Sequence, residues 1–235
     1  MPDSVRLRVC IAGRFVSPMP SLRQLLAAHA PLLVLDAASA RIQVGWIEGP
    51  DPANAKWEAA DEEAGTGVFR CLKKLGANVN AARALVFCEG PGSVLGIRTT
   101  AMALRTWQVV APRPAYGYGS LALVAEAQGR DNVTIIADAR RELWHAHKRG
   151  GGLHRVPAGE LVGELVGELM MPENFRHWSS LPATVRPVPY ELRKLFAQVA
   201  EADLFHLAEA PDAFLHEEPS YATWSAKIHR APGSS

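Results

Sequence analysis

The chain has 235 residues, of which 48% are hydrophobic and 21% are charged, and its formal net charge is +1. This composition is ordinary for a globular protein with a buried core, and so small a net charge argues against RNA binding by the chain alone. The cysteines Cys10, Cys71 and Cys88 form no C-x-x-C pair, which argues against a disulfide framework or a zinc ribbon. Because no apolar run reaches the roughly 20 residues of a membrane span, we expect no membrane contact and a location in a reducing cytoplasm.

Residues 1–30 are predicted to form an N-terminal extension outside the core. Arginines interrupt its apolar stretches, so it does not read as a signal peptide. A short amphipathic helix is expected over 21–29, after a Pro18-Met-Pro20 break. Met19, within this break, is an alternative first residue.

The core is predicted to open with a hairpin. A buried apolar strand at 32–35 leads into a turn that begins at Asp36 and includes Ser39. Hydrophobic residues then alternate along a returning strand at 42–46. After a loop rich in Pro, Asp and Asn, a helix is expected over 59–75.

A second apolar strand, at 85–88, runs into a glycine-rich elbow and directly out into a helix that ends before Pro112. In this elbow Gly90 and Gly92 allow backbone angles that other residues avoid, and Ser93 can cap the helix. Backbone N–H groups at such a helix start attract anions, so the elbow is a candidate phosphate site. Its spacing fits neither the dinucleotide fingerprint nor a Walker loop.

The pattern of strand, Asp-Ala turn and returning strand occurs twice. After a helix expected over 120–128, an apolar strand at 134–137 leads to a turn at Asp138 and a returning strand at 143–147. Asp138 thereby takes the place that Asp36 has in the first hairpin. Such internal similarity predicts two related lobes.

The predicted fold is therefore α/β with a duplicated mixed sheet, in a first lobe at 31–128 and a second lobe at 129–235. Within the second lobe a tandem Gly-Glu-Leu repeat at 159–169 is expected to be helical, and apolar residues at 192–199 recur at helical spacing. The tail at 217–230 is expected to dock through its aromatic residues and to pack back on the first lobe.

Asp36 and Asp138 are the main candidates for chemistry. Two-lobed nucleotide-binding proteins of the actin, hexokinase and Hsp70 type place carboxylates near Mg²⁺ and phosphate at such strand-to-turn junctions. Each aspartate can instead accept backbone N–H bonds in its own turn. Arg140 and Arg141 can also pair with Asp138 without any ligand.

Arg98 lies in the first turn of the helix that follows the elbow, where a cation opposes the helix dipole. Either a bound anion or a salt bridge to an acid such as Glu89 or Asp138 explains such an arginine. Both interpretations are open at the level of the sequence.

His145 and His147 share one face of a predicted strand, so they could bind a metal only with a third ligand such as His154. Incomplete ligand sets seldom hold a metal, and we expect no metal site. The sequence also lacks a His-x-x-x-His pair, a His-Glu-x-x-His motif and a Gly-x-Ser-x-Gly elbow. These absences argue against a metallopeptidase or a serine hydrolase.

Four segments carry a further signal, namely Leu35-Asp-Ala-Ala-Ser39, Gly90-Pro-Gly-Ser-Val-Leu-Gly-Ile-Arg98, Tyr118-Gly-Ser-Leu121 and Ile136-Ala-Asp-Ala-Arg-Arg141. In order and spacing they resemble the bacterial TsaB family, also called YeaZ. The resemblance covers residues 32–145, and the elbow is its most specific motif. It implies a two-lobed actin-like fold of the ASKHA, RNase H-like class.

The resemblance implies a noncatalytic scaffold subunit, without catalytic residues of its own, for a TsaD-like enzyme that makes N6-threonylcarbamoyladenosine at position 37 of tRNA. A TsaE-like ATPase is an implied further partner, and tRNA is expected only within the complex. A homodimer of the isolated chain would use the surface that otherwise binds the TsaD-like enzyme. No cofactor is required, although ATP or ADP with Mg²⁺ could occupy a shared interface. The nucleotide or anion candidates are Asp36, Ser39, Gly90, Gly92, Ser93, Arg98 and Asp138.

The helices at 59–75 and 94–110 are implied to form the packed bundle with TsaD, where small residues would permit close approach. The candidates are Gly65, Gly67, Ala101 and Ala103. The same helices are also expected to pack against their own sheet, on the opposite side.

The alternative function is an active nucleotide-dependent kinase or ATPase of the same fold. It would use Asp36 for Mg²⁺ and the elbow at 90–93 for phosphate. The sequence offers it no obvious catalytic base.

Overall fold

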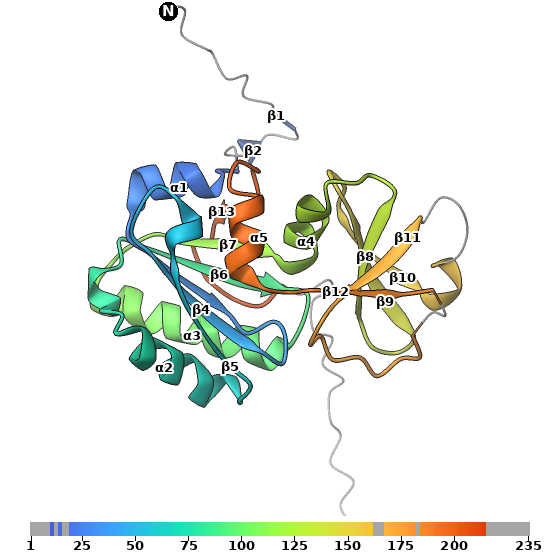
Figure 1. Ribbon diagram of the computed structural model, residues 1–235, viewed down its shortest axis with the longest axis horizontal. Helices are drawn as coiled ribbons and strands as arrows, with labels where there is room; N and C mark the ends of the chain where they lie inside the picture. Colours follow the sequence, from blue (N-terminus) through green and yellow to red (C-terminus); the bar gives the residue numbers. More distant parts are fainter. Residues whose placement is uncertain (1–9, 12–13, 16–18, 162–166, 182–183, 215–235) are drawn as a thin grey trace, which may run out of the picture.

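The computed structural model describes residues 10–11, 14–15, 19–161, 167–181 and 184–214. Two mixed sheets lie beside one another, and the first carries helices on both of its faces (Figure 1). A short antiparallel ribbon of β1 (Cys10–Ile11) and β2 (Arg14–Phe15) precedes them in the chain. None of the helices in the described part is both long and apolar enough to cross a membrane.

The first lobe contains a six-stranded sheet. Its strands are β3 (Leu32–Asp36), β4 (Ile42–Ile47), β5 (Lys56–Ala60), β6 (Ala84–Gly90), β7 (Ala115–Gly119) and β13 (His206–Leu207). Their order across the sheet is β13-β7-β6-β3-β4-β5. β3, β4 and β5 are antiparallel neighbours, whereas β6 and β7 run parallel to β3, and β13 closes the edge antiparallel to β7.

The second lobe repeats this arrangement with five strands. They are β8 (Val133–Asp138), β9 (Leu143–Lys148), β10 (Leu153–Pro157), β11 (Glu168–Pro172) and β12 (Arg186–Val188), in the order β10-β9-β8-β11-β12. β8, β9 and β10 are antiparallel neighbours, and β11 and β12 run parallel to β8. The predicted duplicated mixed-sheet fold is therefore confirmed, with Asp36 and Asp138 each ending the first strand of its sheet.

Five α-helices and three short 3-10 helices accompany the sheets in the described residues. The α-helices are α1 (Leu22–His29), α2 (Ala64–Leu75), α3 (Val94–Val110), α4 (Ser120–Gln128) and α5 (Leu192–Gln198). The 3-10 helices are η1 (Pro52–Asn54), η2 (Val79–Ala81) and η3 (Ala158–Glu160). The predicted hairpin, the strand before the elbow and the helices near 94–110, 120–128 and 192–199 are confirmed.

Helices cover both faces of the first sheet, because β3 places apolar side chains on both faces. Leu33 and Leu35 point to a core that α2 and α3 cover, and Leu32 and Val34 point to the opposite core under α1, α4 and α5. Successive side chains of a strand face opposite sides of the sheet, so a strand with apolar residues on both sides must be covered twice. β3 is fully buried as a result.

Helix α1 corrects the expectation that residues 1–30 lie outside the core. Its N-cap Ser21 and Gln24 form a capping box, and Leu22, Leu25 and Leu26 are buried in the first lobe. The amphipathic pattern seen in the sequence is thus a core-facing stripe. The expectation fails for α1, because its three buried leucines hold it against the core of the first lobe, whereas a solvated appendage would leave them exposed.

The helix expected over 59–75 begins later than predicted. Residues 56–60 form β5, whose backbone pairs with β4, and α2 starts only at Ala64. Pairing with a neighbouring strand satisfies the backbone N–H and C=O groups of this segment, and this tertiary contact overrides its local helical pattern.

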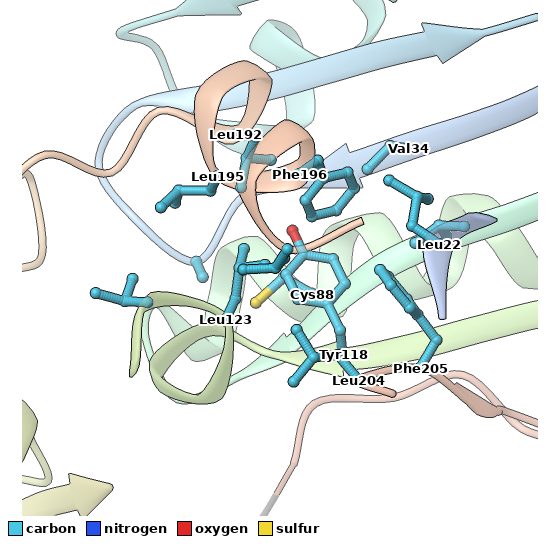
Figure 2. Close-up of a cluster of buried hydrophobic side chains, with 14 of the residues drawn as sticks. Leu22, Val34, Cys88, Tyr118, Leu123, Leu192, Leu195, Phe196, Leu204 and Phe205 are labelled. Carbon is cyan, nitrogen blue, oxygen red and sulfur yellow. The ribbon is translucent and has the colours of Figure 1, made fainter. Parts of the chain in front are cut away.

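An aromatic cluster fills the core between the first sheet and α5. The ring of Phe196 lies edge-on to three others, with centroid distances of 5.3 Å to Tyr118, 5.7 Å to Phe205 and 5.7 Å to Trp57. Figure 2 shows the rings of Phe196, Tyr118 and Phe205, together with Leu192 of the same helix as Phe196. Such edge-to-face arrangements are the preferred geometry for aromatic pairs.

The C-terminal third departs most from the sequence pattern. The tandem repeat expected as a helix over 159–169 ends in β11, where Glu168 pairs with Val133 of β8, so the helical prediction is wrong there. Residues 162–166 and the tail at 217–230 lie outside the described residues. The second lobe was expected to include everything from 129 to 235, but α5 already packs on the first sheet, and after it His206 pairs with Gly117 at the edge of that sheet.

Candidate functional site

The glycine elbow and the turn after β3 are packed directly against each other. A Cβ on Gly92 would lie 2.4 Å from the carbonyl oxygen of Ala38, and the N–H of Ser93 donates to that oxygen across 2.7 Å. The hydroxyl of Ser93 accepts from the N–H of Gly96, as its expected capping role requires. The N–H of Ser93, one of the groups expected to bind an anion, is therefore already hydrogen-bonded to the protein.

A cleft of about 300 Å³ lies between the two lobes, at the two Asp-Ala turns. Of the predicted anion-site residues it brings together Ser39, Gly92, Ser93 and Asp138. Residues that the sequence did not single out complete the lining, among them Phe175, Arg176 and Trp178 from the loop after β11. Arg140 and Arg176 add two cationic side chains to the lining from the second lobe.

Asp36 lies beneath this cleft and does not line it. The residue is 0% exposed. Its carboxylate accepts from the hydroxyls of Tyr118 at 2.6 Å and Tyr190 at 2.7 Å, and from the N–H of Ala38 at 2.9 Å. Burial raises the pKa of Asp36 above its ordinary value, although these three hydrogen bonds favour the charged form.

The surroundings of Asp36 do not fit a metal-bound nucleotide. A hard cation such as Mg²⁺ needs oxygen atoms that it can reach and several waters beside them. Here both carboxylate oxygens accept protein hydrogen bonds and no part of the residue meets solvent. In this arrangement Asp36 behaves as an acceptor for hydroxyl groups.

Asp138 occupies the equivalent place in the second lobe but has a different environment. Its carboxylate accepts from the backbone N–H groups of Arg140, Trp178 and Ser179. Partial burial acts to raise the pKa of Asp138, but these hydrogen bonds outweigh it and hold the pKa below the ordinary value. Asp138 therefore accepts a backbone hydrogen bond within its own turn, as one of its two expected roles requires. It also joins the loop after β11 to the turn after β8.

Arg140 contributes to this turn in a way that the sequence did not indicate. Its guanidinium lies over the Trp178 ring, 4.6 Å from the centroid, and its backbone N–H donates to Asp138. The residues Arg140, Arg141 and Glu142 all have positive φ angles, which non-glycine residues rarely adopt.

The partner of Arg98 is not one of the acids predicted for it. Its guanidinium lies 3.7 Å from the carboxylate of Asp212. That carboxylate also lies 3.5 Å from Arg105, which is about two turns further along α3. Glu89 accepts instead from the ring of His206, at 3.0 Å. The expected salt bridge exists, but it fastens the C-terminal segment to α3.

Gly90 lies apart from the interlobe cleft. It lines a smaller cavity of about 190 Å³, together with Glu89, His206 and Phe214. The seven predicted anion-site residues are therefore spread over several places: four line the cleft, while Asp36, Gly90 and Arg98 lie elsewhere.

The described residues contain no cluster of three or more His, Cys, Asp or Glu side chains that could hold a metal ion. His145 and His147 are half-buried on one face of β9, as the strand period requires. Burial lowers the pKa of His147, and the nearby His154 lowers it further.

The four small residues proposed for a partner interface do not share one face. Gly67 and Ala101 are buried toward the sheet, and a Cβ on Gly67 would meet the side chain of Ile42 at 2.5 Å. Gly65 is exposed with open space around it, and Ala103 is half-buried. The assignment is therefore wrong for Gly67 and Ala101, because their close approach is to their own sheet.

The outward face of α3 carries a line of apolar and neutral side chains, which we call the α3 stripe: Leu95, Thr99, Met102, Thr106 and Val109. Leu95 is 79% exposed, Met102 57% and Val109 85%. Both threonine hydroxyls donate to carbonyls of the preceding helical turn, so they have no need of a further partner. Phe69 on the adjacent α2 is 51% exposed.

The residues that sequence reasoning missed are those that surround Asp36. In the sequence Tyr118 is visible only as part of a motif, and nothing marks Gln43 or Tyr190. The side chain of Gln43 donates to the carbonyl of Tyr190 and accepts from the N–H of Leu192, both at 2.9 Å. No local pattern marks these residues, because their partners are distant in the chain.

The fold is shared with known structures. YeaZ from Pseudomonas aeruginosa superposes with a TM-score of 0.52 at 18% identity, over 72% of this chain and 89% of that chain. A second structure, described as an uncharacterized protein with similarity to peptidase YEAZ from Pseudomonas aeruginosa, has a TM-score of 0.51 at 19% identity, over 71% of this chain and 88% of that chain. No protein-family model and no curated protein sequence matches the chain. The chain thus has the two-lobed actin-like fold of the YeaZ structures.

Proposed function

We propose that this chain belongs to the TsaB (YeaZ) family and is a noncatalytic partner subunit of a TsaD-like enzyme that forms N6-threonylcarbamoyladenosine at position 37 of tRNA. Two observations of different kinds support the family. The four sequence segments occur in the expected order, and the duplicated sheets superpose on YeaZ structures over most of their length.

The observation that carries the partner role is the α3 stripe. Leu95, Met102 and Val109 expose large apolar side chains along one face of a helix of 17 residues. Scattered exposed apolar residues are normal, but a continuous line on a regular element is typical of a surface that another protein covers. Arg98 and Arg105 border the stripe, as charged residues border the apolar centre of many interfaces.

The hydrogen bonding of the two strand-end aspartates supports the noncatalytic part of the proposal. The carboxylates of Asp36 and Asp138 both accept hydrogen bonds from the protein itself. A kinase of this fold needs a carboxylate that is free to hold a metal at this junction. We therefore assign the chemistry to the partner, with a TsaE-like ATPase as a third component and tRNA bound only by the complex.

Co-expression with the TsaD-like protein of the same genome tests the proposal. With the tag on the partner, the untagged chain is expected to co-elute in a one-to-one ratio. Met102→Arg places a charge in the centre of the stripe and is expected to weaken binding at least tenfold, a loss of about 1.4 kcal/mol. Failure of the wild-type chain to bind would overturn the proposed function.

Leu207→Arg is the matched control for this variant. Leu207 is 54% exposed and apolar, but it lies on β13 at the edge of the first sheet. It is expected to bind like the wild type and to melt at a similar temperature. Equal binding by the two variants would show that the α3 stripe is not the interface.

Titration calorimetry with Mg-ATP separates the scaffold from the kinase alternative. We expect no heat of binding and no turnover by the chain alone, and any nucleotide site to appear only in the presence of the partner proteins. Tight binding that is lost in Asp36→Asn would favour the kinase. A homodimer formed by the isolated chain is expected to dissociate on addition of the partner, because both would use the α3 stripe.

A further inference from the structure

The buried carboxylate of Asp36 joins the first strand of the first sheet to the connection that leaves the second sheet. One of its two hydroxyl donors, Tyr118, is on β7 in the same sheet as Asp36 itself. The other, Tyr190, lies on the connection that leaves β12 of the second sheet and enters α5. Both hydroxyls donate to the same oxygen atom, Oδ2.

Gln43 holds the same connection from the neighbouring strand. Its side-chain amide donates to the carbonyl of Tyr190 and accepts from the N–H of Leu192, so both of its polar atoms are used. Gln43 is 7% exposed and Tyr190 is 3% exposed. Because buried polar groups are stable only when paired, the hairpin of β3 and β4 requires the connection to stay in place.

A second segment of the second lobe is fastened at the same point. The N–H of Ala40 donates to the carbonyl of Asn174 at 2.7 Å, and the ring of Phe175 packs edge-on against Tyr190 with a centroid distance of 5.0 Å. The tip of the first hairpin therefore contacts both the loop after β11 and the connection after β12.

We propose that Asp36, Gln43 and Tyr190 form an interlobe latch that keeps the two lobes in one relative arrangement, so that the cleft does not open and close. Because only Pro189 separates Tyr190 from β12, moving the second sheet away would pull the Tyr190 hydroxyl from a buried carboxylate and the backbone of the connection from the Gln43 amide. Such coupled buried hydrogen bonds resist separation more strongly than isolated ones. This role of Asp36 does not depend on the proposed function.

Two tyrosine variants test the latch. Tyr190→Phe removes the hydroxyl that the connection after β12 donates to Asp36, and Tyr118→Phe removes a similarly buried hydroxyl that donates to the same oxygen from β7. The readout is amide hydrogen exchange by NMR at two N–H groups: that of Ala40, which donates to the loop after β11, and that of Leu192, which donates to Gln43 from the connection.

In Tyr190→Phe both amides are expected to exchange at least tenfold faster than in the wild type, while the amide of Val34 in β3 is unchanged. Tyr118→Phe is expected to leave the same two amides as slow as those of β3. Equal acceleration in the two variants, or none in Tyr190→Phe, would overturn the latch. Should Tyr190→Phe not fold, Gln43→Met removes the other half of the latch. The Leu192 amide then loses its own acceptor, so the informative result is faster exchange of the Ala40 amide, whose acceptor is the carbonyl of Asn174.

Discussion

The hydroxyl of Tyr190 donates to the carboxylate of Asp36 across 2.7 Å, between the chain that leaves the second sheet and the first strand of the first sheet. The topologically equivalent Asp138 is half-buried and accepts hydrogen bonds from the backbone N–H groups of Arg140, Trp178 and Ser179. The same residue type at the same strand end thus has opposite pKa shifts, raised for Asp36 by burial and lowered for Asp138 by amide hydrogen bonds that outweigh its partial burial. Environment, and not position in the fold, decides the role of each carboxylate.

Asp36 gives a first prediction about pH. Burial raises the pKa of Asp36 from 3.8, so the folded protein binds this proton more tightly than the unfolded chain does. Its contribution to stability is then fully present below the unfolded pKa and is lost as the pH rises through the folded pKa. We expect the free energy of unfolding of the wild type to fall relative to Asp36→Asn over that window.

Urea denaturation of both proteins from about pH 4 to about pH 7 measures this difference directly. Only the difference between the two proteins is informative, because other titrating groups act equally on both. A difference that stays constant over the range, or grows in favour of the wild type, would contradict a raised pKa.

The pair of His206 and Glu89 gives the opposite pH dependence to that of an ordinary carboxylate. The hydrogen bond to Glu89 raises the pKa of His206 above 6.5, against the effect of burial. The stabilisation is therefore fully present below the unfolded pKa and disappears as the pH rises through the folded value. His206→Gln is expected to melt below the wild type in acid and to approach it in alkali. Melting curves at several pH values test this, and parallel curves would exclude the pair as a source of pH dependence.

The packing of the elbow against the first turn predicts the effect of adding a single methyl group. In Gly92→Ala the new Cβ would lie 2.4 Å from the carbonyl oxygen of Ala38, and φ is +154°. Because the obstacle is backbone, we expect a loss of about 1–3 kcal/mol in the free energy of unfolding. Gly65→Ala is the control, since its Cβ meets nothing within 4 Å. In a helix this change should stabilise by roughly 0.5–1 kcal/mol, and chemical denaturation distinguishes the two signs.

The aromatic cluster around Phe196 predicts a large effect of truncation. Phe196 is fully buried and touches three rings edge-on. Phe196→Ala should lower the free energy of unfolding by about 3–5 kcal/mol through lost burial and the cavity left behind. Phe69→Ala removes the same ring from an exposed site and should change stability by less than about 0.5 kcal/mol. Similar losses in the two variants would contradict the position of Phe196 in the core.

Much of the fold could be predicted from local patterns. The hairpin of β3 and β4, the elbow before α3 and the repeated strand and Asp-Ala turn are visible because alternation, glycine placement and capping residues act between near neighbours. The strands β5 and β13 were not visible. They are edge strands whose backbone groups are satisfied by β4 and β7, and nothing in their own short sequences demands that pairing.

Some residues of the candidate sites could likewise be predicted from local patterns, and others could not. Ser39, Gly92, Ser93 and Asp138 were predicted because each belongs to a turn or a helix start with its own local signature, and the fold then brings them to one cleft. The direction in which Gly67 and Ala101 face depends on which side of each helix meets the sheet. The family resemblance does not give that direction, and the interface inferred from it placed both residues wrongly at the outer surface.

The sequence by itself determined that two like units would form, each with an aspartate where its first strand ends, because strand and turn propensities are local. Only the tertiary structure decided what those aspartates do. The hydroxyls that reach Asp36 come from residues 82 and 154 positions further along the chain. Contacts between such distant residues follow from how the sheets and helices pack, and this packing buries one carboxylate while it leaves the other at the cleft.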